Sequence, residues 1–151
     1  MAVVYKTQSV EETEALAERL ASLFRKGDVL AFRGGMGVGK TAFVRGLARG
    51  LDLVGEVASP TFSLVNEYHG VNFVLYHFDM YRITGMEDLY STGFFDYLDT
   101  LPETGMLAIE WSEEIDGCLP DNTTYISIVA TGEECRQIQI DGDERFDHTG
   151  D

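Results

Sequence analysis

Hydrophobic positions follow two different spacings along this chain. Stretches in which apolar residues run continuously or alternate with polar ones are typical of β-strands, and they occupy residues 3–5, 29–32, 62–68, 73–78, 106–109, 124–130 and 136–140. Helical spacing occupies residues 10–24 and 43–51, and shorter or broken helical stretches lie near 87–90 and 93–98. Strands interleaved with helices in this way predict an α/β fold.

Local signals predict how some of these elements begin and pair. Ser9, with Glu12 three residues later, forms a capping box at the start of the first helix. The turn at residues 69–72 predicts an antiparallel hairpin, and the polar residues 131–134 predict a second one. The second hairpin has isoleucines alternating with polar residues, so we expect it to be half exposed.

The most specific chemical signal lies between the strand at 29–32 and the helix at 43–51. Gly34, Gly39, Lys40 and Thr41 match G-x-x-x-x-G-K-[ST], the P-loop signature, in the strand, turn and helix order that the motif requires. The glycines let backbone N–H groups approach phosphate oxygens at a helix N-terminus, which also favours an anion. Lys40 would then reach the β- and γ-phosphates, and Thr41 would offer its hydroxyl to Mg²⁺.

A P-loop site also needs an acid beside the phosphates, and the sequence offers two candidates for it. Asp79 and Glu110 each come directly after an apolar strand, where a carboxylate can hold Mg²⁺ or orient an attacking water. The residues themselves do not rank the two. Thr61 lies in a Pro-containing connection where its hydroxyl is placed either to sense the γ-phosphate or to satisfy the local backbone.

The expected nucleotide is ATP. The sequence Asp52-Leu53-Val54-Gly55 imitates a GTPase D-x-x-G motif but follows a helix rather than a strand, and no N-K-x-D motif specifies guanine. At 151 residues the chain has room for one domain. We expect a single P-loop ATPase domain over 1–141 and a flexible acidic tail over 142–151, because the last ten residues have little apolar content.

Composition excludes several other classes of protein. No stretch approaches the ~20 apolar residues of a membrane span, and the N-terminus lacks the pattern of a secretory signal, so we expect a cytoplasmic protein without a membrane partner. Cys118 and Cys135 are far apart and are expected to be reduced thiols. A formal net charge of −15 argues against tight unaided binding to DNA or any other nucleic acid.

Several further motifs together resemble one family. The chain resembles TsaE, the small ATPase of bacterial tRNA threonylcarbamoyladenosine biosynthesis, from about Ser9 to the hairpin around Arg136. The resemblance is carried, besides the P-loop, by S-P-T-F at 59–62, H-F-D-M-Y-R at 77–82, E-D-L at 87–89, and E-W-S at 110–112.

The resemblance implies a three-layer α/β P-loop fold with a mixed central sheet, and it implies roles for single residues. Thr41 and Glu110 would hold Mg²⁺, Asp79 would position the hydrolytic water or join the metal's water shell, and Thr61 would lie in a switch segment. Trp111 would lie beside the nucleotide site. The expected contacts with ATP are made by Gly35, Met36, Gly37, Val38, Gly39, Lys40 and Thr41, with weaker matches at Arg136 and, on the adenine side, Ser9.

The resemblance also implies partners. TsaE-like proteins act with TsaB and TsaD, the pair that transfers a threonylcarbamoyl group onto the adenosine next to the tRNA anticodon. ATP binding and slow hydrolysis would reset that complex between turnovers. Because this chain is strongly acidic, we expect it to meet tRNA only indirectly, through these partners.

Two other functions use the same residues. A small-molecule or nucleoside kinase would share the P-loop and use an acid such as Asp79 as its base, but it usually needs an arginine-rich lid, for which only Arg82 and Arg136 are available. A nucleotide-gated binding module would need no hydrolysis.

Overall fold

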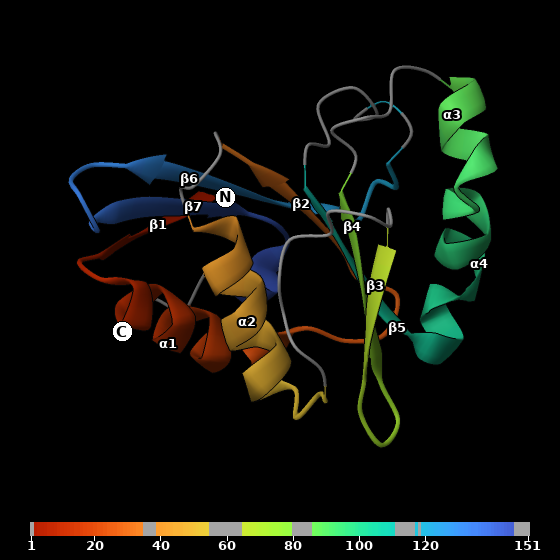
Figure 1. The fold of residues 1–151 in the computed structure, drawn as a ribbon, viewed down its shortest axis with the longest axis horizontal. Coiled ribbons are helices and arrows are strands. Elements are labelled where there is room, and N and C mark those ends of the chain that lie inside the picture. Colours follow the sequence, from red (N-terminus) through yellow and green to blue (C-terminus); the bar gives the residue numbers. More distant parts are fainter. Residues whose placement is uncertain are drawn as a thin grey trace.

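A computed structural model of the chain describes residues 2–34, 39–54, 65–79, 86–110, 117 and 119–146. Its elements follow the predicted interleaving of strands and helices (Figure 1). In chain order they are β1 (Ala2–Thr7), α1 (Val10–Leu20), η1 (Ala21–Leu23), β2 (Val29–Arg33), α2 (Lys40–Gly50), β3 (Val65–His69), β4 (Val74–Asp79), α3 (Met86–Ser91), α4 (Phe94–Thr104), β5 (Gly105–Glu110), β6 (Thr124–Ala130), β7 (Arg136–Asp141) and η3 (Glu144–Phe146).

The described strands form one mixed sheet in the order β1-β7-β6-β2-β5-β4-β3. The central strands run parallel, because β2 pairs with both β5 and β6, and β5 pairs with β4. Antiparallel hairpins, β3 with β4 and β6 with β7, flank this centre, and β1 adds to β7 at the edge. The mixed sheet and both hairpins confirm the expectations from the sequence.

Helices cover the two faces of the sheet in pairs, which makes three layers. Figure 1 shows α1 and α2 together on one side and α3 and α4 on the other. Each pair closes its own apolar core: Leu16 of α1 and Phe43 of α2 pack with Leu30, whereas Leu89 and Phe94 pack with Val29. Strand β5 is buried along its whole length, as expected for a parallel strand covered on both faces.

The start of α1 confirms the capping box. The Ser9 hydroxyl accepts a hydrogen bond from the backbone N–H of Glu12 at 3.1 Å, and the Glu12 carboxylate accepts one from the N–H of Gln8 at 3.0 Å. The first bond satisfies a donor that the first turn of the helix leaves open, whereas the second reaches the residue before the N-cap instead of Ser9 itself. The helix begins where the sequence predicts because the side chain of Ser9 caps its N-terminus.

The chain beyond Asp141 corrects one expectation. Residues 142–146 are not an unanchored tail: Phe146 is fully buried and its ring lies 5.3 Å from that of Phe24. Arg145 donates from both terminal nitrogens to the buried Asp28, at 3.0 and 3.1 Å, and from Nε to Asp143. One aromatic ring and one bidentate ion pair anchor the segment despite its low apolar content.

These ion pairs also shift the pKa values of Arg145 and Asp143. Partial burial alone would lower the pKa of Arg145, but its hydrogen bonds with Asp28 and Asp143 outweigh burial and raise that pKa. The hydrogen bond from Arg145 lowers the pKa of Asp143 below its ordinary value. The stabilising effect of the Asp143 contact is therefore complete above the ordinary carboxyl pKa and disappears as pH falls through the lowered one. Because Asp143 is 47% exposed, solvent screening keeps that effect small.

One predicted element is more regular than its sequence suggests. The aromatic-rich stretch near 93–98 predicts a broken helix or turn, but α4 continues without a break to Thr104. Pro102 lies inside it, in the last turn, just before the helix ends at Gly105. Packing of Phe94 and Leu101 into the core overrides the weak local preference. Within the described residues, no helix is both long and apolar enough to cross a bilayer.

The helices α1 and α2 touch closely at Gly46. A Cβ added there would lie 2.2 Å from the backbone oxygen of Glu14 and 2.8 Å from the Cβ of Ala17. Helix propensity alone favours Gly46→Ala by about 1 kcal/mol, but overpacking costs about 1–3 kcal/mol. We therefore predict a net loss of about 1 kcal/mol in the free energy of unfolding, measured by urea denaturation.

The matched control is Gly117→Ala, because a Cβ at Gly117 meets no atom of the described residues within 4 Å. This variant should stay within about 0.5 kcal/mol of the wild type. A Gly46→Ala protein that is as stable as the wild type would show that α1 and α2 do not depend on this close contact.

Candidate functional site

The candidate site lies at one edge of the sheet, where the parallel strands β2, β4 and β5 end. The last residues of β4 and β5, Asp79 and Glu110, are register partners on neighbouring strands. Strand β2 pairs with β5 up to Ala31 opposite Ile109, so the turn that follows Arg33 begins beside Glu110. Ligands of open α/β sheets bind outside the carboxyl ends of the strands, which is this edge.

The described parts of the P-loop have the backbone that phosphate binding requires. Gly34 and Gly39 have φ values of 134° and 112°, a region that residues with a Cβ rarely adopt. Gly39 is the N-cap of α2 and has no side chain to accept the first N–H groups of the helix. Those donors and the positive end of the helix dipole are therefore suited to an anion.

Lys40, the first residue of α2, has its side chain held beside the glycine-rich turn. Its side chain is buried, with the residue only 5% exposed, and its ammonium group donates to the carbonyl oxygen of Gly34 at 3.1 Å. This bond joins the two ends of the glycine-rich turn. A buried ammonium group needs oxygen partners, and phosphate oxygens are suitable ones.

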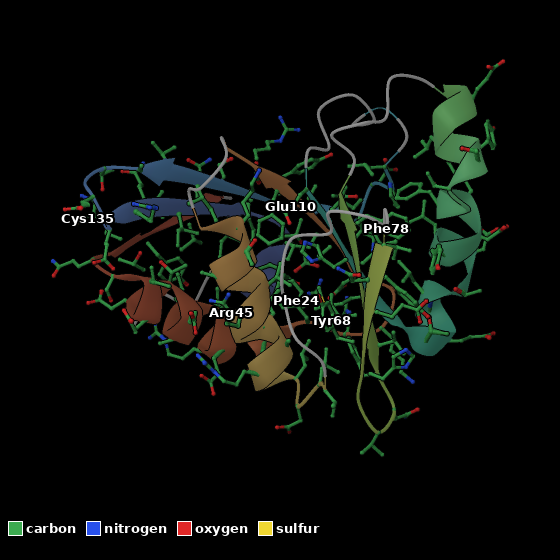
Figure 2. The ribbon with its side chains drawn as sticks, in the orientation of Figure 1. Phe24, Arg45, Tyr68, Phe78, Glu110 and Cys135 are labelled. Carbon is green, nitrogen blue, oxygen red and sulfur yellow. The ribbon has the colours of Figure 1, made fainter. Side chains whose placement is uncertain are left out.

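Glu110 is a buried carboxylate with a histidine partner that the sequence did not indicate. His77 Nε2 and Glu110 Oε2 lie 2.6 Å apart, and the two side chains are 0% and 5% exposed. Both residues lie on the face of the sheet that α1 and α2 cover, because Leu75 and Ala108, two positions earlier on each strand, belong to that core. Figure 2 labels Glu110 at the edge where β4 and β5 end.

His77 belongs to the motif at 77–82, but the histidines of the sequence are scattered and carry no metal-binding pattern, so the sequence assigned it no role. The available signal was a polar residue within the apolar stretch 73–78, two positions before Asp79. The partner of His77 lies 33 residues away in sequence and is brought to it by the pairing of β4 with β5.

Arg136 and Ser9 lie at the ends of other elements. Arg136 opens β7 and donates to the carbonyl oxygens of Gly132 and Cys135 at 3.2 and 2.8 Å, so its guanidinium closes the β6–β7 turn. Its Nε lies 4.0 Å from the position of a Cβ added to Gly39, which places this cation beside the start of α2. The Ser9 hydroxyl caps α1.

Other expected site residues lie outside the described residues. They are Gly35, Met36, Gly37 and Val38 of the P-loop, Thr61 of the expected switch segment, and Arg82 and Trp111. Their roles stay predictions. The donor set that the structure describes at this edge suits a magnesium nucleotide: oxygen ligands from a hydroxyl and a carboxylate suit Mg²⁺, and a buried ammonium and open N–H groups suit phosphate.

Comparisons with known proteins agree on one family. The model of the family "Threonylcarbamoyl adenosine biosynthesis protein TsaE" matches residues 7–138. Among relatives named tRNA threonylcarbamoyladenosine biosynthesis protein TsaE, that of Treponema pallidum is 35% identical over 89% of this chain and 96% of its own length. That of Aquifex aeolicus is 41% identical over 88% and 91%. A crystal structure of YdiB from Bacillus subtilis superposes with a TM-score of 0.76 at 32% identity, covering 99% of this chain and 91% of that one.

The left-handed glycine at the start of α2 generates a prediction about this site. In Gly39→Ala the nearest atoms of the described residues lie 4.0 Å from the new Cβ, so the change acts through backbone strain. Strain of about 1–2 kcal/mol is expected. If the turn shifts to relieve it, ATP affinity measured by calorimetry should fall about tenfold.

Gly93→Ala is the matched control. Gly93 is also a left-handed N-cap glycine, with φ 78° and a nearest neighbour 4.0 Å from the added Cβ, but it opens α4 on the opposite face. It should destabilise the fold to a similar extent and leave ATP affinity unchanged. Equal loss of affinity in both variants would show that Gly39 has no specific part in binding.

Proposed function

This chain belongs to the TsaE family, whose members serve tRNA threonylcarbamoyladenosine biosynthesis, and we propose that its own part is to bind and hydrolyse Mg-ATP. The observation that carries the proposal is the meeting of the P-loop with two strand-terminal acids at one edge of the sheet. Hydrolysis needs both, because phosphates must be held and a water must be oriented beside them.

The nucleotide would be held mainly by the backbone. The N–H groups from Gly35 to Thr41 would surround the phosphates, with Lys40 exchanging its bond to the Gly34 oxygen for phosphate oxygens. This arrangement is supported by the left-handed Gly39 and by the burial of Lys40. Arg136, beside the start of α2, would add a second positive charge at the rim.

The metal would be held by Thr41, the second residue of α2, and by Glu110. When bound, Mg²⁺ neutralises charge that develops on the phosphate oxygens. Asp79, the register partner of Glu110, would orient the attacking water and accept its proton. Thr61 would approach the γ-phosphate from the switch segment.

The partner would be a complex of the TsaB–TsaD type, with tRNA bound by those proteins rather than by this chain. The net charge of −15 supports this division, because an acidic surface attracts a basic partner surface and repels a phosphate backbone. Hydrolysis would then reset the complex between rounds of transfer, by releasing a surface that tRNA also needs.

The proposal predicts the pattern of ATP turnover. Phosphate release would be measured for the purified chain alone and with TsaB and TsaD from the same source. The partners should raise turnover. Lys40→Ala and Glu110→Ala should each lower it about 100-fold or more, because Lys40 would contact the transferring phosphoryl group and Glu110 would hold the metal that neutralises its charge. Lys6→Ala, at an exposed lysine of β1, is the control and should turn over ATP normally.

Other results would support one of the two alternative functions. Transfer of phosphate to an added nucleoside would indicate a kinase. ATP binding with no turnover in any mixture would indicate a nucleotide-gated module, and the hydrolytic roles of Asp79 and Glu110 would be withdrawn.

A further inference from the structure

The side chains of His77 and Glu110 are joined by a hydrogen bond of 2.6 Å between Nε2 and Oε2. In the ionised form that binds a metal, the Glu110 carboxylate can only accept, and His77 Nε2 then donates. Charge assistance makes such a bond short and strong, and burial of both side chains keeps water from competing for it. The Oε2 atom of Glu110 is therefore held in one place.

Packing alone does not account for a histidine at this position. The nearest residues on the same face, Leu75 on β4 and Ala108 on β5, are apolar and fully buried, and an aliphatic side chain would suit that layer. The second ring nitrogen, Nδ1, is buried and has no hydrogen-bond partner among the described residues. A buried polar atom without a partner costs about 1–3 kcal/mol, so the ring costs stability that its bond to Glu110 has to offset.

The pairing of β4 with β5 brings the ring of His77 close to the carboxylate of Glu110. Opposite His77 on β5 stands Ala108, whose small side chain leaves the imidazole room to reach along β5 to Glu110, two residues further. Side chains two residues apart on a strand share a face, so the reach stays within the face that α2 covers. The hydrogen bond from His77 therefore reaches Glu110 from the neighbouring strand on the same face.

We propose that His77 is a positioning residue, which holds Oε2 of Glu110 so that the other carboxylate oxygen, Oε1, is oriented toward Mg²⁺ at the nucleotide site. The inference rests on the proposed function, because it needs Glu110 to be a metal ligand. Loss of a hydrogen bond that orients a metal-binding carboxylate typically reduces metal affinity about 10-fold to 100-fold. His77 itself does not touch nucleotide or metal.

The test separates positioning from a purely structural role. Affinity of the full chain for the non-hydrolysable analogue AMP-PNP would be measured by calorimetry with Mg²⁺ and with EDTA, and the ratio of the two affinities reports the metal's contribution. His77→Leu should lower that ratio about 10-fold to 100-fold and leave the affinity in EDTA unchanged. Glu110→Gln should lower it at least as much.

Conservative variants and a matched control complete the design. The amide nitrogen of His77→Gln reaches roughly where Nε2 lies and should restore the ratio to within about threefold, whereas the shorter His77→Asn should not. If His77→Leu fails to fold, the contrast between Gln and Asn decides. His69→Leu removes an exposed histidine–glutamate contact, the 3.0 Å pair with Glu67 on β3, and should change nothing.

Each other outcome counts against the inference. It is wrong if His77→Leu keeps the wild-type ratio while Glu110→Gln loses it, and the proposed metal site then still stands. It is also wrong if His77→Leu weakens binding equally with and without Mg²⁺, or if a folded His77→Gln protein is not rescued. A wild-type protein whose binding ignores Mg²⁺ would contradict the proposed metal site, and this inference with it.

Discussion

The parallel pairing of β2, β5 and β4 is the constraint on which the rest of the structure depends. These strands are almost wholly apolar and are buried by helices on both faces, so their register is fixed by burial rather than by polar contacts. Because they run in the same direction, their carboxyl ends meet at one edge. The glycine-rich turn after β2 and the terminal acids of β4 and β5, Asp79 and Glu110, are therefore brought to this edge.

The layer formed by α1 and α2 fixes the position of the start of α2 at this edge of the sheet. α2 begins at the P-loop, and its position is fixed by contact with α1 at Gly46 and by the apolar side chains that both helices direct at the sheet. Ion pairs from Arg45 and Arg49 to Glu14 join the exposed sides of the two helices. Those pairs are half exposed and contribute little. The close backbone contact and the apolar core therefore determine where the N-terminal end of α2 lies.

Much of this arrangement could be predicted from local signals. The P-loop, the capping box at Ser9, the two hairpins and the acids at strand ends all depend on residues a few positions apart. What could not be predicted depends on pairing across long sequence distances. The contact of His77 with Glu110 spans 33 residues, and that of Arg145 with Asp28 spans 117. The second of these, with Phe146 against Phe24, orders a segment whose composition predicts none.

The central claim is that Mg-ATP binds at the edge where β2, β5 and β4 end, with Glu110 on the metal. A crystal structure of the chain with Mg²⁺ and AMP-PNP tests it most directly. The phosphates should lie against the N-terminus of α2, and the metal should lie about 2.1 Å from the Thr41 hydroxyl and from one oxygen of Glu110 whose other oxygen stays on His77. A nucleotide bound elsewhere, or a metal held at the P-loop without Glu110, would contradict the account.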